Sequence, residues 1–283
     1  PEIDSILHSF DLSLSTYIEE SLISGINNNT SDSIDYLIQR VLEVSKEVHQ
    51  LSNGAFDITI MPLIEAWGFH GGEKRVLAKE EIDSLLQRVG MDKIKIHEHR
   101  IQKANPDVRL DVNAIAQGYS VDIACEFLDG KGISNYLVEI GGELRTKGIN
   151  SRGVDWIIGI DKPEYGNFIP GMNMQQKVQL GNLSLATSGN YRSYFEVDGK
   201  KYTHSFDPET GMPAVKNILS ASIVCKDCIY ADALATACMV MGYKDGLEMI
   251  NNIKDTEAYL VYSDEDGRFQ VACTDGFKNI LID

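Results

Sequence analysis

The chain has 283 residues, of which 43% are hydrophobic and 24% are charged, and its formal net charge is -16 at pH 7. This composition predicts a globular protein with a sizeable core, and the negative charge argues against nucleic acid or an anionic membrane as a partner. The sequence contains no apolar run long enough to span a membrane.

The N-terminal part predicts one strand and one long helix. Residues 4–19 begin with apolar positions, which we interpret as a strand. They continue into the polar segment SLSTYIEE, which we interpret as a loop that carries Tyr17. From Ile34 to Leu51, apolar residues recur at spacings of three and four, so we predict a helix there, capped by Ser31 to Ser33.

The segment SNGAFDITIMPLIEAWGF is unusual in composition. Its Gly-Ala pair, followed by Phe and Asp, allows a backbone turn to approach a ligand closely, and ITI predicts a short strand. A bend with large aromatic side chains is predicted from Pro62 to Phe69. Trp67 either stacks on a planar ligand or fills the core.

The middle of the chain predicts a helix, a hairpin and a second helix of small residues. We predict a helix from Lys79 to Val89 and a hairpin with strands at 94–96 and around Ile101. Leu110 to Val112 are predicted as a strand that leads into the next helix, which places Asp111 at the junction, where amides are good phosphate donors.

The second half predicts mostly strands joined by short turns. YLVEIGGELRTK predicts two strands around a Gly-Gly turn, and VDWIIGID predicts another; residues 169–179 are an edge strand or a loop. Asp198-Gly199 predicts a hairpin, and DPETGMP predicts a tight turn just after His204. Further elements are a strand at 220–224, helices at 227–242 and 243–253, and a hairpin within 258–272. We predict an α+β fold with largely antiparallel sheets and flanking helices, as one domain, 1–283, or as two closely packed subdomains.

The segment DCIYADALATACMVMG, residues 227–242, predicts a helix on which Asp232 and Thr236 lie one turn apart. A carboxylate and a hydroxyl suit Mg²⁺ better than zinc, and Mg²⁺ completes its shell with phosphate oxygens and water. Such an ion also supplies the positive charge that an acidic protein needs to bind phosphates. The structural alternative is a buried helix whose Asp caps the first turn and whose Thr bonds to a carbonyl.

Other polar residues have both a functional and a structural interpretation. Cys225 and Cys228 form a CxxC, but the chain has no second CxxC and no His pair at ligand spacing, which favours separate thiols or an incidental disulfide. The hydroxyl-rich loop at 187–190 either contacts phosphate or satisfies a turn. Glu139 and Glu143 either bond to ribose or adenine or are simply exposed.

Six segments, in this order, resemble the ApbE family, the FAD:protein FMN transferases. They are SLSTY, SNGAFDITIMPLIEAWGF, LDVNAIAQGY, EIGGELR, ATSGNYR with YTHSFDPETGMP, and CIYADALATACMVMG. The resemblance implies an ApbE-like (T-fold-like) architecture and a Mg²⁺-dependent enzyme that cleaves the pyrophosphate of FAD. Such an enzyme attaches FMN to a Thr or Ser of an acceptor protein and releases AMP.

The resemblance also implies site residues. The metal ligands would be Asp232, Thr236 and the backbone carbonyl of Ala114. The flavin contacts would be Tyr17, Ala55, Phe56, Asp57, Asp111, Gln117 and the region of His204, Ser205 and Phe206. Two departures are expected to matter: the family often has Gly at the position of Asn113 and Lys at the position of Gln117, and its segment before the first strand, with another flavin contact, is expected to be missing.

Asp232 and His204 are the predicted catalytic residues. His204 either accepts the proton of the attacking hydroxyl or only hydrogen-bonds a turn. Two other activities use the same site: an FAD pyrophosphatase with water as the nucleophile, and a protein that holds FAD without cleaving it. The family is usually exported and lipid-anchored on the periplasmic side of the bacterial inner membrane, so we expect this location, with the leader removed.

Overall fold

The computed structural model describes residues 2–164, 171–190, 194–197, 200–214 and 216–282. The chain divides into two compact units, and each is described by itself. The first unit comprises residues 1–116 and 195–215, and the second comprises residues 117–194 and 216–283. Within the described ranges, no helix has both the length and the apolar character needed to cross a lipid bilayer.

The first unit is mainly helical. The predicted helix at 34–51 is confirmed as α3, whose N-cap is Asp35 rather than Ser31 to Ser33; the Asp35 carboxylate accepts a hydrogen bond of 2.9 Å from the amide of Ile38. The described elements of this unit are α1 (Glu2–Leu14), α2 (Leu22–Asn27), α3 (Tyr36–Leu51), α4 (Met61–Ala66), α5 (Lys79–Leu86), the short 3-10 helix η1 (Met91–Lys93), the hairpin β1 (Ile94–His97) and β2 (Arg100–Lys103), most of β8 (Tyr194–Val197), and β9 (Lys200–Thr203).

Three strand predictions in this unit are wrong. Residues 2–14 form α1, because Ile6, Phe10 and Leu14 recur at helical spacing and Phe10 and Leu14 are buried. Residues 58–60 form a turn, with only an isolated bridge at Ile60, and α4 follows at once with Pro62 in its first turn. Residues 110–112 are not a strand, although α6 (Asn113–Gly130) begins where the small-residue helix was predicted.

The second unit is built on a six-stranded sheet with strand order β12-β11-β10-β7-β4-β3. All five neighbouring pairs are antiparallel. Its strands are β3 (Tyr136–Ile140), β4 (Glu143–Lys147), β7 (Ser184–Gly189), β10 (Ile218–Cys225), β11 (Glu257–Ser263) and β12 (Phe269–Cys273). A three-stranded antiparallel sheet, in the order β13-β6-β5, contains β5 (Trp156–Asp161), β6 (Met174–Leu180) and β13 (Leu281–Ile282).

The two sheets of this unit share one apolar core. Side chains from β4, β7, β10 and β11 pack with side chains from β5 and β6 and with Phe277 of α9 (Asp275–Lys278). The buried members are Leu144, Ile158, Ile160, Val178, Leu180, Leu185, Val224, Tyr259, Val261 and Phe277. The residues predicted as an edge strand or loop at 169–179 thus include β6, the middle strand of the smaller sheet.

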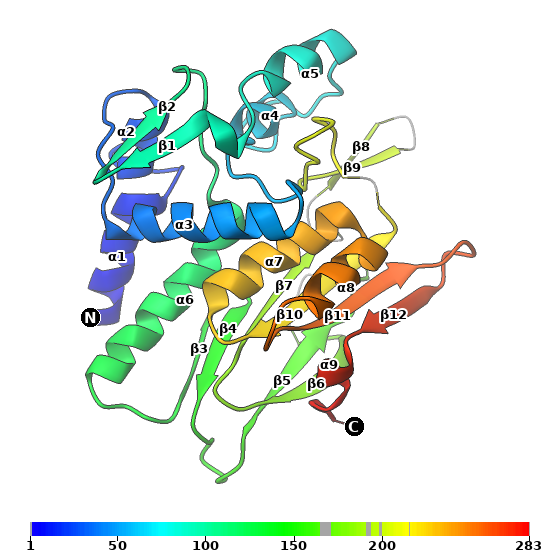
Figure 1. The fold of residues 1–283 in the computed structure, drawn as a ribbon. Coiled ribbons are helices and arrows are strands. Elements are labelled where there is room, and N and C mark those ends of the chain that lie inside the picture. Colours follow the sequence, from blue (N-terminus) through cyan, green and yellow to red (C-terminus); the bar gives the residue numbers. More distant parts are fainter. Residues whose placement is uncertain (1, 165–170, 191–193, 198–199, 215, 283) are drawn as a thin grey trace. The chain divides into compact units, whose positions relative to one another are not determined.

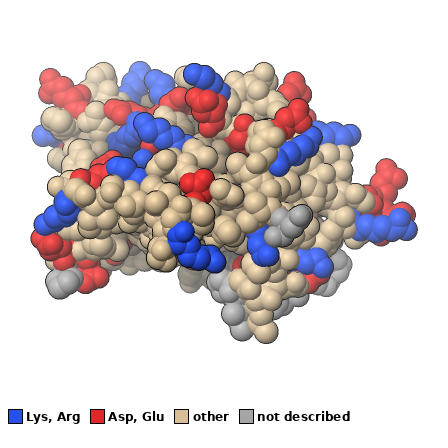
Figure 2. All heavy atoms as spheres, turned by 90° about the horizontal axis from the view of Figure 1, so that it is seen from below, with Lys and Arg blue, Asp and Glu red and all other residues tan. Residues whose placement is uncertain are grey.

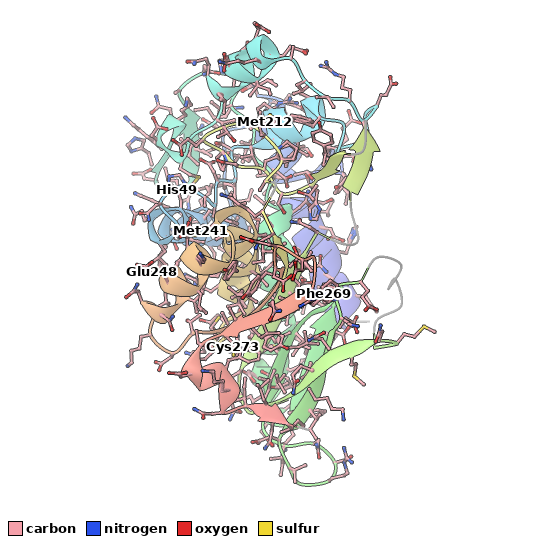
Figure 3. All side chains as sticks on the ribbon, turned by 90° about the vertical axis from the view of Figure 1, so that its right-hand side faces the viewer. His49, Met212, Met241, Glu248, Phe269 and Cys273 are labelled. Atoms are coloured by element: carbon pink, nitrogen blue, oxygen red, sulfur yellow. The ribbon has the colours of Figure 1, made fainter. Side chains whose placement is uncertain are left out.

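Two helices pack on the large sheet of the second unit, α7 (Cys228–Met241) against β7 and β10 and α8 (Tyr243–Asn251) against β11 (Figure 1). Only Gly242 separates them, with a φ of 88°, a left-handed conformation that glycine adopts without strain. Met241 of α7 and Glu248 of α8 mark this helix pair in Figure 3.

The predicted α+β class with largely antiparallel sheets is confirmed. The Asp198-Gly199 turn lies outside the described residues, although the strands beside it, β8 (Tyr194–Val197) and β9, do pair. On the face drawn in Figure 2, Lys and Arg side chains are interspersed with Asp and Glu side chains.

Candidate active site

Helix α7 carries Asp232 and Thr236 on one side, one turn apart, as the sequence predicts. The helix is apolar on all sides, which explains why most of it is buried. Asp232 is only 6% exposed, and Thr236 is half-buried. The helix therefore holds a carboxylate and a hydroxyl within an otherwise apolar environment.

Each of these two side chains is bonded to a neighbouring element of the second unit. Asp232 Oδ2 accepts a 2.8 Å hydrogen bond from the amide of Gly118 in α6, and the hydroxyls of Thr236 and Ser188 are 3.1 Å apart. Ser188 belongs to β7 and not to the loop that was predicted. The N-cap of α7 is Asp227, so the structural alternative in which Asp232 caps the first turn is wrong.

The carboxylate of Asp232 is poorly compensated. Among the described residues, the Gly118 amide is its only hydrogen-bond donor. Burial raises the pKa of Asp232 to about 7, and the bond from Gly118 lowers it only in part. Either a proton or a cation would relieve this buried charge.

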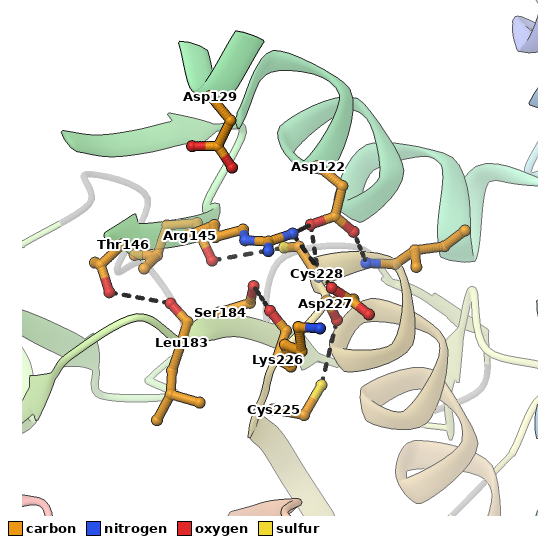
Figure 4. Close-up of polar contacts among 12 residues, drawn as sticks. Asp122, Asp129, Arg145, Thr146, Leu183, Ser184, Cys225, Lys226, Asp227 and Cys228 are labelled. Carbon is orange, nitrogen blue, oxygen red and sulfur yellow. Dashed lines mark hydrogen bonds and ion pairs between the residues drawn. The ribbon is translucent and has the colours of Figure 1, made fainter. Parts of the chain in front are cut away.

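The first turn of α7 is held by Asp122 of α6 (Figure 4). Asp122 accepts hydrogen bonds from the amides of Cys228, at 3.0 Å, and Ile229, at 2.9 Å. Arg145 of β4 donates to Asp122 at 2.6 Å and lies 3.3 Å from Asp227. Burial alone would lower the pKa of Arg145, but the hydrogen bond and charge of Asp122 outweigh it and raise this pKa, so the guanidinium stays charged.

Gly118 allows α6 and α7 to approach closely. A Cβ at this position would lie 2.4 Å from the carbonyl oxygen of Cys228 and 2.7 Å from Cβ of Asp232. No side chain fits at such distances without movement of one helix. The glycine thus permits the short bond between its amide and the carboxylate of Asp232.

In the first unit, Tyr17 stacks on His70, with ring centroids 4.7 Å apart. Although 70% of Tyr17 is exposed, partial burial of its hydroxyl group, and then the charge of Asp111, raise its pKa. Both rings line a pocket of about 270 Å³ that also includes the ion pair of Arg109 with Glu65. Thr16 Oγ1 and His70 Nδ1 are buried at this pocket and lack a hydrogen-bond partner among the described residues.

With this geometry established, comparison with known proteins identifies the family. The sequence profile of the ApbE family matches residues 1–260. A curated relative from Vibrio cholerae, named FAD:protein FMN transferase, is 36% identical over 99% of this chain and 84% of its own length. The chain belongs to the ApbE family.

Solved ApbE structures have the same fold. The flavin transferase ApbE from Vibrio cholerae superimposes with a TM-score of 0.87 and 34% identity, over 99% of this chain and 89% of that chain. The flavinyl transferase ApbE from Pseudomonas stutzeri, in its apo form, gives a TM-score of 0.86 and 31% identity, over 99% and 86% of the two chains. The relatives are transferases by name, and this ApbE chain is accordingly a transferase enzyme.

The ApbE metal ligands expected on α7 fit a magnesium ion. Asp232, Thr236 and the neighbouring Ser188 offer carboxylate and hydroxyl oxygens, which are hard donors, and no positive side chain among the described residues pairs with the carboxylate. Within the described ranges there is no group of three or more His, Cys, Asp or Glu that could hold a metal, so a zinc-like cluster is not assembled there. Ala114, the third expected ligand, is the second residue of α6 and belongs to the first unit.

The expected flavin contacts at 55–57 have buried side chains in the first unit, except Ala55, which is half-buried. The Asp57 carboxylate accepts hydrogen bonds from the amide and hydroxyl of Thr59, at 2.7 and 2.6 Å, and from the amide of Met91, at 3.1 Å. Phe56 is 2% exposed, and its carbonyl oxygen is 2.8 Å from His49 Nδ1. The side chains of Phe56 and Asp57 therefore stabilise the turn itself and leave its backbone as the part able to meet a ligand.

The segment of His204 to Phe206 also belongs to the first unit. His204 is exposed just after β9, Ser205 is 8% exposed, and Phe206 is 1% exposed. The ring of Phe206 packs against Trp67 and Phe69, with centroid distances of 6.2 and 5.6 Å. Trp67 is fully buried and donates from Nε1 to the carbonyl of Gly211 at 3.1 Å, so it is a core residue and not a ligand platform.

Gln117 and Asp111 both have local structural contacts. Gln117, in the second unit, donates from Nε2 to the carbonyl of Ile140 at 3.2 Å, beside the turn at Gly141. Asp111, in the first unit, is 7% exposed, accepts a 2.8 Å hydrogen bond from the amide of Asn113, and has a pKa raised by burial. Glu143, expected near ribose or at the surface, is buried, whereas Glu139 is exposed.

The cysteine thiols take no part in this site. All five are free thiols, including Cys273 at the end of β12 (Figure 3). Cys225 and Cys228 are buried, and their Sγ atoms donate to the carbonyls of Asp227 and Leu144. Burial raises the pKa of Cys225 to about 12, so a reactive thiolate is disfavoured. Of the two alternatives left open for the CxxC, separate thiols or an incidental disulfide, the structure has the separate thiols.

Sequence reasoning missed His70, Gly118, Asp122 and Arg145. Asp122 carried a signal, because it stands between Val121 and Ile123 in a helix of small and apolar residues, where an unpaired charge would be unfavourable. Its partners Arg145, Cys228 and Ile229 lie 23, 106 and 107 residues away, and nothing local identifies them.

Proposed function

We propose that this ApbE protein transfers the FMN moiety of FAD to a Thr or Ser hydroxyl of an acceptor protein, with Mg²⁺ held at Asp232 and Thr236. The names of its relatives support the donor and the type of transfer. The observation that carries the metal assignment is the buried carboxylate of Asp232: the described residues offer it one hydrogen-bond donor, the Gly118 amide, and burial raises its pKa to about 7.

The proposed reaction breaks the phosphoanhydride bond between the two phosphates of FAD and forms a phosphoester with the acceptor. The acceptor oxygen forms a bond to the phosphorus of the FMN half, and the bond from this phosphorus to the oxygen bridging to AMP breaks. AMP departs with the electron pair of that bond, and the hydroxyl proton passes to a base. Phosphoryl transfer of this kind depends mainly on positioning and on neutralisation of charge.

The residues of α7 and its neighbours would bind and orient the pyrophosphate. When bound, Mg²⁺ would neutralise the phosphate oxygens and stabilise the leaving group. Asp232 would bind the ion through its carboxylate, with Gly118 fixing one oxygen, and Thr236 would offer its hydroxyl while Ser188 holds it in place. The predicted ligand Ala114 and the predicted flavin contacts Tyr17, Ala55, Phe56, Asp57, Asp111, Gln117, Ser205 and Phe206 stay predictions.

We also propose His204 as the base that takes the hydroxyl proton, because an imidazole titrates close to neutral pH. Replacement by Ala, followed by flavin transfer at several pH values, tests this role. With Mg²⁺ saturating at every pH, so that metal binding to Asp232 does not shape the profile, a reduced rate that no longer depends on pH near neutrality is expected. An unchanged rate and pH profile would exclude His204 from the mechanism.

One assay distinguishes the three possible activities. Purified protein is incubated with FAD and Mg²⁺, with and without a candidate acceptor, and AMP and protein-bound flavin are measured. The proposal predicts AMP only when acceptor is present, in equal amount to the bound flavin. AMP without acceptor would indicate a pyrophosphatase, and intact bound FAD would indicate a flavin carrier.

The metal assignment has its own variants. Asp232→Asn is expected to reduce AMP release by at least about 100-fold, because a positioned charge-neutralising group is typically worth that much. Thr236→Val, which removes only the hydroxyl, is expected to reduce the rate, and Thr236→Ser, which keeps it, should retain most activity. Full activity of Asp232→Asn would refute the metal site.

We propose a location outside the cytoplasm, on the periplasmic side of the inner membrane, with a lipid anchor in the full-length protein. The family resemblance supports this proposal. Fractionation of cells that express the full-length gene tests it: recovery in the membrane fraction, with protease sensitivity only after the outer membrane is opened, is expected.

A further inference from the structure

Helices α6 and α7 are tied together at two points within the second unit. Gly118 and Asp122 lie four residues apart on α6, and Asp232 and Cys228 lie four residues apart on α7. The Gly118 amide donates to Asp232, and the Cys228 amide donates to Asp122. The two helices thus run antiparallel where they meet, and the two bonds are one helical turn apart. In one bond the amide belongs to α6 and in the other it belongs to α7.

Asp122 is fully engaged at its end of this contact. Its two carboxylate oxygens accept from two amides at the start of α7 and from the guanidinium of Arg145 (Figure 4). A carboxylate at a helix N-terminus is favoured by the helix dipole as well as by these bonds. With its oxygens occupied, Asp122 is not available to bind a metal ion itself.

The first turn of α7 determines where Asp232 lies. Asp232 follows Cys228 by four residues on the same side of a continuous helix, so a shift or rotation of the first turn moves its carboxylate by a similar amount. The contact at Gly118 leaves no free space, because a single added carbon there would overlap Cys228 and Asp232. Metal ligands must be held to about 0.5 Å for full affinity.

We propose that Asp122 and Arg145 are positioning residues that hold α7 so that the carboxylate of Asp232 is placed for divalent-cation binding. This inference rests on the proposed function, which makes Asp232 a metal ligand. Arg145 acts by keeping Asp122 charged and by linking it to Asp227 across the start of the helix. Removal of either side chain loosens the first turn of α7, and the carboxylate of Asp232, one turn later, is then held less firmly.

A purely structural role of Asp122 makes a different prediction. In that case, loss of the side chain lowers the melting temperature, but the molecules that remain folded bind the cation normally. A positioning role lowers the affinity of the folded protein. The two are separated by measuring affinity well below the melting temperature of each variant.

The chain offers a matched control on the same two elements. Asp129 of α6 and Lys147 of β4 form an ion pair of 2.8 Å, with side chains 39% and 41% exposed, and neither is bonded to α7 among the described residues. Asp129→Asn and Lys147→Gln therefore remove an ion pair between the same helix and strand. They remove none of the hydrogen bonds that Asp122 makes at the start of α7.

The experiment measures Mn²⁺ affinity of the full chain by titration followed with electron paramagnetic resonance. Asp122→Asn and Arg145→Gln are expected to bind Mn²⁺ about 10-fold more weakly than the unmodified protein, the usual effect of removing support from a metal ligand. Arg145→Lys, which keeps the charge, should recover part of the affinity. Asp129→Asn and Lys147→Gln should stay within about twofold.

Hydrogen exchange of the Gly118 amide provides a second readout that does not depend on metal. In the metal-free protein, Asp122→Asn is expected to speed this exchange, because the bond to Asp232 loosens, while Asp129→Asn leaves it unchanged. Should Asp122→Asn fail to fold, Arg145→Gln and Arg145→Lys carry the same test.

The outcomes separate this inference from the proposed function. If the unmodified protein binds no Mn²⁺, or if Asp232→Asn binds it equally well, the metal site itself is wrong. If the unmodified protein binds Mn²⁺ through Asp232 while folded Asp122→Asn and Arg145→Gln bind with the same affinity, the site stands and the positioning role is refuted.

Discussion

The two ends of the contact between α6 and α7 treat buried negative charge in opposite ways. At the start of α7, Asp122 receives hydrogen bonds from Cys228, Ile229 and Arg145. One turn further, Asp232 receives one hydrogen bond from the described residues, that of the Gly118 amide. Both carboxylates are buried, with 3% and 6% of each residue exposed.

This difference is the reason that Asp232, and not Asp122, is proposed as a metal ligand. A buried charge is tolerated when it is paired and hydrogen-bonded, and Asp122 meets that condition. Asp232 does not, so its environment favours a proton or a cation over the bare carboxylate, and its pKa of about 7 expresses that preference. The two aspartates are buried to a similar extent, so burial does not distinguish them. They differ in the number of hydrogen-bond donors that each carboxylate receives.

The largest effects are expected from replacing each aspartate with asparagine. The two substitutions should change the free energy of unfolding in opposite directions. In metal-free protein at pH 8, Asp232→Asn is expected to raise the free energy of unfolding by up to about 4 kcal/mol, the value of a pKa raised by about three units. Asp122→Asn is expected to lower it by about 3 kcal/mol, because Arg145 and two amides lose a charged acceptor. Urea denaturation in EDTA measures both.

The pH dependence follows from the sign of the shift at Asp232. Because the folded pKa of about 7 lies above the unfolded value of 3.8, the stability that Asp232 contributes is fully present below that unfolded value and is lost as pH rises through 7. The advantage of Asp232→Asn should therefore vanish near pH 4. If the stability gain of Asp232→Asn were the same at every pH, or if this variant were less stable than the unmodified protein at pH 8, the Asp232 carboxylate would not be the poorly compensated charge described above.

A smaller effect is expected from closing the space between the helices. Gly118→Ala should destabilise the protein by about 2 to 3 kcal/mol, since the added carbon overlaps the backbone of Cys228 and the side chain of Asp232. Gly130→Ala, in the same helix but with open space around it, should change stability by less than about 1 kcal/mol. Equal melting temperatures of the two variants would mean that the close approach at Gly118 is not rigid.

The smallest effect concerns the first unit, where aromatic contact rather than charge is expected to bind the ligand. Tyr17→Ala should weaken FAD binding by up to about 10-fold, the value of one aromatic stacking contact, and Tyr17→Phe should stay within about twofold. Quenching of flavin fluorescence measures both affinities. Unchanged binding by Tyr17→Ala would remove Tyr17 from the flavin contacts.

Local sequence signals predicted much of the fold. The periodicity of α3 and the hairpin of β3 and β4 around Gly141-Gly142 are determined by nearby residues, and both were predicted. The strand predicted at 58–60 failed because Thr59 bonds to Asp57 and to the amide of Gly90, contacts that compete with strand pairing. At α1, the helical spacing of the apolar residues was present but was interpreted as a strand.

From the sequence, the site could be predicted only where its residues lie on the same helix or strand. Asp232 and Thr236 are one turn apart in sequence, so the sequence alone places them together. The support from Asp122, Arg145 and Ser188 depends on which helix and strands pack against α7, and those contacts join residues up to 107 positions apart. Periodicity and turn signals carry no information about such pairs.

The most direct test of the central claim is calorimetric titration of the protein and of Asp232→Asn with Mg²⁺ at pH 6 and pH 8. Since a carboxyl group with a pKa of about 7 must lose its proton to bind a cation, the affinity of the unmodified protein should be about 10-fold higher at pH 8 than at pH 6. Asp232→Asn should bind weakly at both values. Equal affinity at the two pH values, or tight binding by Asp232→Asn, would contradict the assignment of Asp232 as the metal ligand.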